Sequence, residues 1–131
     1  MRKPVDTVAV IVAKDNGLLV ERRKFTKETD PGKVAIPGGH VENGESFEEA
    51  CSRELLEELD LTCESFSFIV SLPHHTESED QVVHYFSCDG WRGVPRCHEA
   101  EEIFWVDRRH LEVLDFEIDR TAASKFLIDR A

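Results

Sequence analysis

The segment from Gly38 to Leu61, with the sequence GGHVENGESFEEACSRELLEELDL, constrains the fold more than any other part of this chain. Within it, Ser46 and Glu49 have the spacing of a capping box, which favours a helix that begins at Ser46. An apolar stripe then recurs every four residues along that helix, at Phe47, Cys51, Leu55 and Leu59. We therefore predict an amphipathic helix over residues 46–59 that packs against a hydrophobic core through this stripe.

Segments rich in β-branched and aromatic residues lie on both sides of this helix and predict short strands. The predicted strands cover residues 7–12, 18–22, 34–36, 65–72, 82–88 and 103–106. Asn16-Gly17 predicts a hairpin turn between the first two strands, whereas the polar residues 24–32 and 73–80 predict loops. A second helix is expected over residues 119–129, with an inward face formed by Ala122, Ala123, Phe126 and Leu127. Strands interleaved with two helices indicate one α/β domain over residues 1–131, in which helices sandwich a mixed β-sheet.

The chain of 131 residues carries 16 Lys and Arg against 27 Asp and Glu, which gives a net charge of −11. This charge argues against a protein that binds nucleic-acid phosphates directly, so we expect no stable nucleic-acid complex. A small phosphate-bearing molecule is compatible with it if divalent cations lie between ligand and protein. No apolar run approaches the ~20 residues of a membrane-spanning helix, and the run at residues 8–13 is too short for a signal peptide. We therefore expect a cytoplasmic protein without a membrane partner.

The four cysteines, Cys51, Cys63, Cys88 and Cys97, form no C-x-x-C pair. Without an export signal, buried free thiols are expected and no disulfide framework is implied. Cys88, Cys97 and His98 could together contribute to a zinc site, but their spacing matches none of the usual zinc motifs.

Three carboxylates of the first predicted helix, those of Glu54, Glu57 and Glu58, are spaced to project from one face. Glu54 and Glu58 form a like-charge pair, which costs the helix roughly a few tenths of a kcal/mol. Such a group is a poor stabilising device and a good ligand set for a hard divalent cation, although a solvated acidic face explains the pattern equally well. The preceding Gly38-Gly39 pair lets the backbone approach a ligand closely. Together, the glycine loop and the carboxylates favour a metal-bridged diphosphate site.

These residues resemble the Nudix box, the pattern G-x5-E-x7-R-E-U-x-E-E-x-G-U in which U is aliphatic. The matching positions are Gly39, Glu45, Arg53, Glu54, Leu55, Glu57, Glu58 and Leu61. The resemblance to Nudix hydrolases, MutT-like enzymes that cleave nucleoside diphosphates linked to another moiety, implies an α/β/α sandwich with a mixed sheet. It also implies dependence on Mg²⁺ or Mn²⁺.

Asp60 stands where the pattern has glycine. Glycine after a helix end usually adopts a left-handed conformation, and an acid there opposes the negative end of the helix dipole. We therefore expect Asp60→Gly to keep activity and to add up to about 1 kcal/mol of stability.

The resemblance further implies roles for individual residues of the box. The positions that ligate metal and take part in catalysis match Glu54, Glu57 and Glu58. The carbonyl of Gly39 matches a further metal ligand. Arg53 and Glu45 match positions that support the loop and helix through an ion pair. Arg53 is also expected among the catalytic residues.

Outside the helix, Glu99 is the candidate for a late metal ligand or general base, and Glu101 and Glu102 are the alternatives. Arg23 matches a phosphate-binding position in related nucleoside triphosphate hydrolases, with Arg22 as the alternative. Further substrate contacts are expected from the backbone of Gly38 and Gly39.

Within the family, the compact chain favours a nucleoside triphosphate, ordinary or oxidised, cleaved to a monophosphate and pyrophosphate. The alternatives are hydrolysis of ADP-ribose, another sugar nucleotide or a dinucleoside polyphosphate, or a catalytically idle domain that senses nucleotides. The expected partner is a small-molecule nucleotide, and a homodimer is left open.

Overall fold

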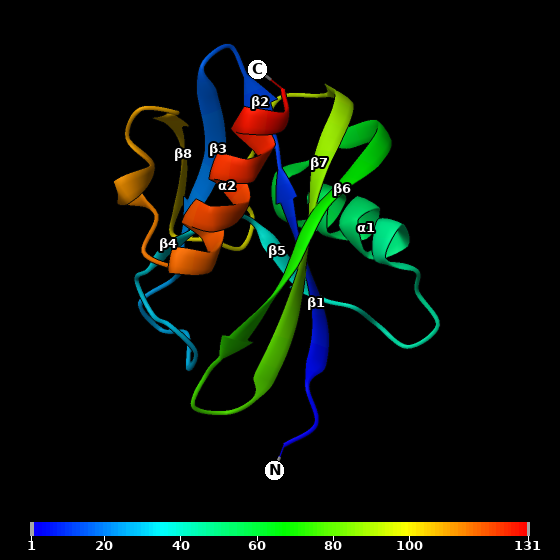
Figure 1. Cartoon of the computed structure of the whole chain (residues 1–131), viewed down its shortest axis with the longest axis vertical. Coiled ribbons are helices and arrows are strands. Elements are labelled where there is room, and N and C mark those ends of the chain that lie inside the picture. The colour runs from blue at the N-terminus through cyan, green and yellow to red at the C-terminus, as the bar shows by residue number, and fades with distance from the viewer. Residues whose placement is uncertain (1, 131) are drawn as a thin grey trace.

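Residues 2–130 are described by the computed structural model of this chain, and they form two β-sheets and two α-helices (Figure 1). In chain order the strands are β1 (Val5–Ile11), β2 (Ala13–Lys14), β3 (Gly17–Arg22), β4 (Val34–Ala35), β5 (Gly38–His40), β6 (Thr62–His75), β7 (Asp80–Arg92) and β8 (Glu102–Asp107). Helix α1 covers Phe47–Leu59, a 3₁₀ turn covers Leu111–Val113, and helix α2 covers Glu117–Asp129.

The larger sheet is mixed and has the strand order β5-β1-β7-β6. β1 runs parallel to β7 and antiparallel to β5, and β6 runs antiparallel to β7. In the second sheet, β2, β4 and β8 all pair antiparallel with β3. The predicted α/β architecture with a mixed sheet is therefore confirmed.

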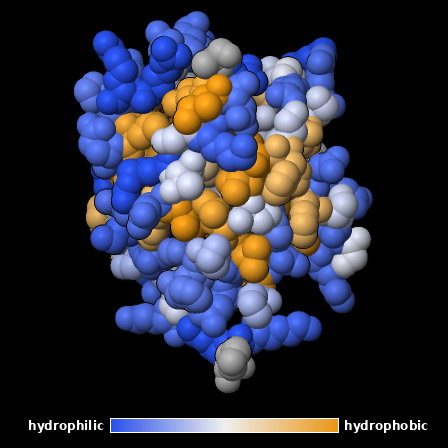
Figure 2. Space-filling view, viewed as in Figure 1, coloured by the Kyte–Doolittle hydropathy of each residue, from blue (hydrophilic) through white to orange (hydrophobic). Residues whose placement is uncertain are grey.

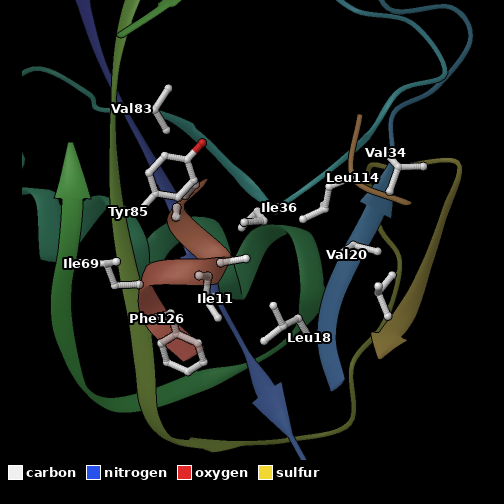
Figure 3. Packing of buried hydrophobic residues seen from close by; sticks show 14 residues of the cluster. Ile11, Leu18, Val20, Val34, Ile36, Ile69, Val83, Tyr85, Leu114 and Phe126 are labelled. Carbon is white, nitrogen blue, oxygen red and sulfur yellow. The ribbon is translucent and has the colours of Figure 1, made fainter. Parts of the chain in front are cut away.

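β1 lies at the centre of the fold, and its side chains from Thr7 to Ile11 are therefore buried on both faces of the sheet. One core lies beneath α1 and includes Val8, Val10, Leu55 and Leu59. The other core lies beneath α2 and includes Ile11, Tyr85, Ala122 and Phe126 (Figure 3). The two helices thus cover opposite faces of the larger sheet (Figure 1).

The chain changes sheets after β1, and this corrects the predicted first hairpin. The sequence predicts that residues 7–12 and 18–22 pair, but β2 is the element that pairs with the start of β3, and from the predicted strand only Val12 reaches it, through a 2.9 Å hydrogen bond from the Leu19 N–H to its carbonyl. Asp15, with φ of 54°, takes the left-handed position of this short turn. β1 pairs instead with β5 and β7, since an apolar strand buried on both faces belongs in the interior of a sheet.

Helix α1 begins and ends where the sequence predicts. The Ser46 hydroxyl accepts a hydrogen bond from the Glu49 N–H at 3.0 Å, and Glu49 Oε1 accepts one from the Ser46 N–H at 2.9 Å. This confirms the capping box. Helix α2 begins slightly earlier than predicted, and the expected inward residues are buried apart from Leu127, which is partly buried.

The hairpin of β6 and β7 is longer than predicted, so the loop expected over residues 73–80 is wrong at both ends. Pro73–His75 still pair with residues 80–82, because a strand ladder continues to gain main-chain hydrogen bonds even through a polar local sequence. Cys63 of β6 and Cys88 of β7 form a disulfide, which contradicts the expectation of four free thiols. Pairing of the strands brings these distant cysteines together, whereas Cys51 and Cys97 are free.

Apolar side chains gather along the middle of the face seen in Figure 2, with hydrophilic residues around them. Among the described residues, the exposed large hydrophobic side chains include Phe68 of β6, at 59%, and Ile128 of α2, at 73%. Neither α1 nor α2 has the length and apolar character that a helix needs to cross a membrane.

Asp119 ties α2 to both sheets. Its buried carboxylate accepts a hydrogen bond from the Tyr85 hydroxyl of β7 and one from the Ile36 N–H, just after β4, at 3.1 Å. In Figure 3 the Tyr85 hydroxyl points away from Phe126 and out of the apolar cluster. Burial raises the pKa of Asp119 from 3.8 to about 6, although the two hydrogen bonds oppose the shift.

We predict that Asp119→Asn flattens the pH dependence of stability. A carboxyl whose folded-state pKa is raised stabilises the fold fully below its unfolded pKa and loses that contribution as the pH rises through about 6. Between pH 4.5 and 7.5, the free energy of unfolding of the wild type should therefore fall by about 2 kcal/mol relative to that of the variant. Urea denaturation of both proteins measures this difference, and parallel pH profiles would contradict it.

Candidate functional site

Three carboxylates converge at one point, although they come from two distant parts of the chain. Glu54 and Glu58 lie on α1, and Glu99 lies in the segment that connects β7 to β8. One carboxylate oxygen from each lies within 4.8 Å of the others. Glu54 and Glu58 are buried and Glu99 is exposed, so the group opens to solvent at Glu99. We call Glu54, Glu58 and Glu99 the acidic cluster.

Glu21 of β3 adds a fourth carboxylate beside the acidic cluster, and the motif does not include it. It is 6% exposed and lines the same cavity as Glu58. Burial raises the pKa of Glu21, and the charges of Glu99 and Glu54 add to the rise while Arg23 opposes it. The sequence could have indicated that Glu21 is buried, because Glu21 directly follows the apolar residues 18–20, which predict a buried strand.

Glu58 is the least compensated of these groups. It is only 8% exposed, and within residues 2–130 no group donates a hydrogen bond to it or forms an ion pair with it, so its oxygens meet solvent only in the adjoining cavity. Burial raises its pKa most, and the negative charges of Glu21, Glu54 and Glu99 raise it further. Because a buried carboxylate without a partner is costly, the arrangement favours entry of positive charge.

Arg53 joins α1 to the loop that precedes it. Its guanidinium donates to both oxygens of Glu45, at 2.7 and 2.9 Å, to Glu54 at 2.9 Å and to the His40 carbonyl at 3.0 Å. It also lies 3.3 Å from Glu57, which projects to solvent outside the acidic cluster. The hydrogen bonds from Arg53 lower the pKa of Glu45 to about 2. Burial raises the pKa of Glu54 in spite of the opposing contact with Arg53.

Gly38 and Gly39 bring β5 into close contact with its neighbours. A Cβ atom at Gly38 would overlap the main chain of β1, at 2.8 Å from the Cα of Ala9. A Cβ atom at Gly39 would overlap the Glu54 carboxylate, at 2.6 Å from its Cδ. The main chain of β1 requires glycine at position 38, whereas a side chain at position 39 would displace the Glu54 carboxylate, so the main chain of Gly39 lies directly against that carboxylate.

A cavity of about 700 Å³ opens beside the acidic cluster. Part of its wall comes from the loop after β3 and carries the cationic side chains of Arg23, Lys24 and Lys27. Another part carries Tyr85, Phe116 and Asp119. The cavity therefore joins carboxylates, cations and aromatic surface in one space.

The alternative residues lie elsewhere. Glu101 and Glu102 are outside the acidic cluster. Arg22 pairs with Glu102 at 3.1 Å and donates to the Gly32 carbonyl at 3.0 Å, whereas Arg23 lines the cavity and donates to the Thr29 carbonyl at 3.1 Å. Cys97 lies in the same segment as Glu99, but its possible zinc partner Cys88 is held in the disulfide.

The donor set of the acidic cluster suits a hard divalent cation. All its ligand atoms are carboxylate oxygens, which Mg²⁺ and Mn²⁺ prefer over nitrogen and sulfur. A cation there would stabilise the ionised form of Glu58, which burial and the neighbouring carboxylates disfavour and which Lys27 offsets only in part. Glu54, Glu58 and Glu99 thus fit such an ion, and an anion such as a diphosphate could reach it through the cavity.

Nearly the whole chain is similar to known proteins. Residues 3–126 match the family model described as the NUDIX domain. The chain is 28% identical over 116 residues to the 8-oxo-dGTP diphosphatase of Escherichia coli (strain K12), covering 88% of this chain and 89% of the relative. It is 45% identical over 120 residues to the ADP-ribose pyrophosphatase of Methanocaldococcus jannaschii, covering 89% of this chain and 70% of the relative.

Solved structures share the fold. A MutT NUDIX hydrolase from Burkholderia pseudomallei superimposes with a TM-score of 0.81 at 25% identity, covering 94% of this chain and 98% of that protein. A MutT protein from Methanosarcina mazei Go1 gives a TM-score of 0.87 at 21% identity, covering 99% of this chain and 98% of that protein. The element order and the two covering helices are therefore shared with proteins of this family.

Proposed function

This chain belongs to the NUDIX family and is a hydrolase of phosphoric anhydrides, and on that premise we propose that it is a Mg²⁺- or Mn²⁺-dependent pyrophosphohydrolase of nucleoside triphosphates. The proposed products are a nucleoside monophosphate and pyrophosphate. The observation that carries the proposal is the acidic cluster, in which buried Glu58 lacks a partner among the described residues and borders a cavity of nucleotide size.

In this proposal Glu54, Glu58 and Glu99 hold the ion, and the Gly39 carbonyl and Glu57 are further oxygen ligands at the edge of the site. Bound Mg²⁺ would neutralise diphosphate charge and lower the pKa of a coordinated water. Glu54 and Glu58 would fix the place of the ion, because they lie about one turn apart on a helix that the core beneath it holds in position. Arg53 restrains Glu54 through its 2.9 Å hydrogen bond.

Glu99 is the proposed late ligand or general base. Its carboxylate is exposed, and no group in residues 2–130 donates a hydrogen bond to it, so it is free to accept a proton from the attacking water. Arg23, Lys24 and Lys27 are proposed to bind the phosphate oxygens. Their charge offsets the field of a protein whose net charge is −11, which would otherwise repel the substrate.

The part of the cavity wall formed by Tyr85, Phe116 and Asp119 supports a nucleobase as the remaining part of the substrate. The ring of Phe116 is half-buried and provides surface for stacking, whereas fully buried Tyr85 holds the carboxylate of Asp119, which provides a polar group beside that ring. Similarity to the 8-oxo-dGTP diphosphatase of Escherichia coli, which this chain covers over 89% of its length, favours an oxidised or ordinary nucleoside triphosphate.

ADP-ribose hydrolysis is the second candidate function. It is favoured by the 45% identity to the ADP-ribose pyrophosphatase of Methanocaldococcus jannaschii. Both candidates place a diphosphate on the acidic cluster and a base in the cavity, so they differ in the group attached beyond the diphosphate.

A nucleotide panel separates the proposals. Purified protein with Mg²⁺ is offered 8-oxo-dGTP, dGTP, CTP and ADP-ribose, and the products are identified. Pyrophosphate release from a triphosphate supports the main proposal, whereas AMP and ribose phosphate from ADP-ribose support the second. A rise in melting temperature with nucleotide, without turnover of any compound, would support a nucleotide sensor instead.

We predict that Glu58→Gln changes three properties together. The metal-free variant should melt at the same or a higher temperature than the wild type, because a neutral amide replaces a group whose ionised form burial and the neighbouring carboxylates disfavour. The rise in melting temperature with Mg²⁺ should shrink. In the wild type, Mg²⁺ at 100 times its dissociation constant should add about 2.7 kcal/mol to the free energy of unfolding. Turnover should be mostly lost.

Differential scanning fluorimetry and a pyrophosphate-release assay measure these properties. Glu48→Gln is the matched control, since Glu48 lies exposed in the first turn of the same helix and should leave metal response and turnover unchanged. A Glu58→Gln variant that keeps both its activity and its metal response would refute the proposed role of the cluster.

We predict that Glu99→Gln lowers turnover by roughly 10²-fold, the scale expected for loss of a general base, with little change in folding. Glu101→Gln, two residues along the same segment and outside the acidic cluster, serves as the control and should turn over normally. Normal turnover in Glu99→Gln together with a deficit in Glu101→Gln or Glu102→Gln would move the role along the segment.

A further inference from the structure

Asp60 is the one position of the box at which this chain departs from the family pattern, and the structure shows that it carries two costs. It caps α1 in a left-handed conformation, with φ of 58° and ψ of 30°. That conformation is unfavourable for a residue with a side chain. Its negative charge also lies at the negative end of the helix, whose last turn has no basic residue.

The carboxylate of Asp60 has specific partners, which the sequence did not reveal. Its Oδ2 lies 2.9 Å from His98 Nε2 and 3.8 Å from Arg96 Nε. Both partners belong to residues 93–101, the segment between β7 and β8 that carries Glu99. We call residues 93–101 the Glu99 segment.

The Glu99 segment is also bound to the end of α1 through the main chain. The Arg96 N–H donates to the Leu59 carbonyl at 3.0 Å, and the His98 N–H donates to the Glu58 carbonyl at 3.1 Å. At the start of the segment Gly93, with φ of 114°, packs so closely that a Cβ there would lie 2.9 Å from the Asp60 carbonyl oxygen. The side-chain contact between Asp60 and His98 therefore joins two surfaces that already meet.

The position of the Glu99 carboxylate depends on this segment. No hydrogen bond or ion pair within residues 2–130 orients the Glu99 side chain itself, yet its oxygen lies within 4.8 Å of those of Glu54 and Glu58. The residue directly before it, His98, is held by Asp60. We propose that Asp60 is a positioning residue that, through His98, holds Glu99 against Glu54 and Glu58; this rests on the proposed role of Glu99.

A plain surface ion pair is the competing explanation, because the side chains of Asp60 and His98 are 44% and 47% exposed. A half-exposed pair stabilises a fold very little. A positioning role predicts something different, namely a local effect on the cation site without loss of global stability. Binding of the metal alone separates the two explanations, because it requires no turnover.

The test measures Mn²⁺ binding to the substrate-free protein by titration calorimetry or by electron paramagnetic resonance, alongside melting temperature and the kcat and KM of the nucleotide reaction. Asp60→Gly and His98→Ala should each raise the Mn²⁺ dissociation constant threefold to tenfold. The double variant should be no worse than either single one, because both break the same contact. The kcat at low Mn²⁺ should fall, saturating Mn²⁺ should restore it, and the nucleotide KM should change little.

Two variants act as controls. Asp60→Asn keeps a residue that tolerates the left-handed conformation and an oxygen that can accept from His98, so it should bind Mn²⁺ within twofold of the wild type. Asp15→Gly removes another left-handed aspartate, with φ of 54°, from the β2–β3 turn. Asp15→Gly should gain stability, because glycine adopts the left-handed conformation without the cost of a side chain, and it should leave Mn²⁺ binding unaltered. This revises the expectation that Asp60→Gly is functionally silent.

Wild-type Mn²⁺ affinity in Asp60→Gly, combined with weakened binding in Glu99→Gln, would overturn the positioning role and leave the proposed site intact. Additive losses in the double variant would overturn it as well. Wild-type affinity in Glu99→Gln would show that Glu99 lies outside the metal site, and the positioning role would fall with that assignment.

Discussion

Burial of like-charged carboxylates in one place is the constraint on which the rest of this structure depends. Burial raises the pKa of Glu21, Glu54 and Glu58, and repulsion from neighbouring carboxylates, including Glu99 in each case, adds to it. The fold holds these groups together with Arg53, which pairs with Glu54 and Glu45, and with a core that fixes α1 on the larger sheet. The glycines of β5 then allow its main chain to approach the same point. Much of the sequence between residues 38 and 61 serves this arrangement.

The local part of this design could be predicted from sequence. The capping box, the apolar stripe and the spacing of Glu54 and Glu58 are properties of a single helix, and the structure shows that helix where it was expected. The position of Glu21 could not be predicted in the same way, because it depends on how β3 packs against α1 across the fold. The disulfide of Cys63 and Cys88 depends likewise on the register of two long strands, and that register is not encoded in cysteine spacing.

Departures from the family pattern carry information of the same kind. Asp60 is unfavourable when only the helix end is considered, but its contact with His98 links that end to the segment that carries Glu99. The cluster thus combines Glu54 and Glu58 on helix α1 with Glu99 on the Glu99 segment. The main-chain hydrogen bonds of residues 96 and 98 to the end of α1 restrict the motion of that segment. Such a division is typical of sites in which a rigid element fixes the ligands and a loop completes them.

The central claim is that the acidic cluster binds a divalent cation, and anomalous X-ray diffraction from a crystal soaked in Mn²⁺ tests it most directly. The predicted result is an anomalous peak within about 2.5 Å of carboxylate oxygens of both Glu54 and Glu58. A map without a peak at the cluster, at a Mn²⁺ concentration that supports full turnover in solution, would contradict the claim, as would a strong peak found only elsewhere.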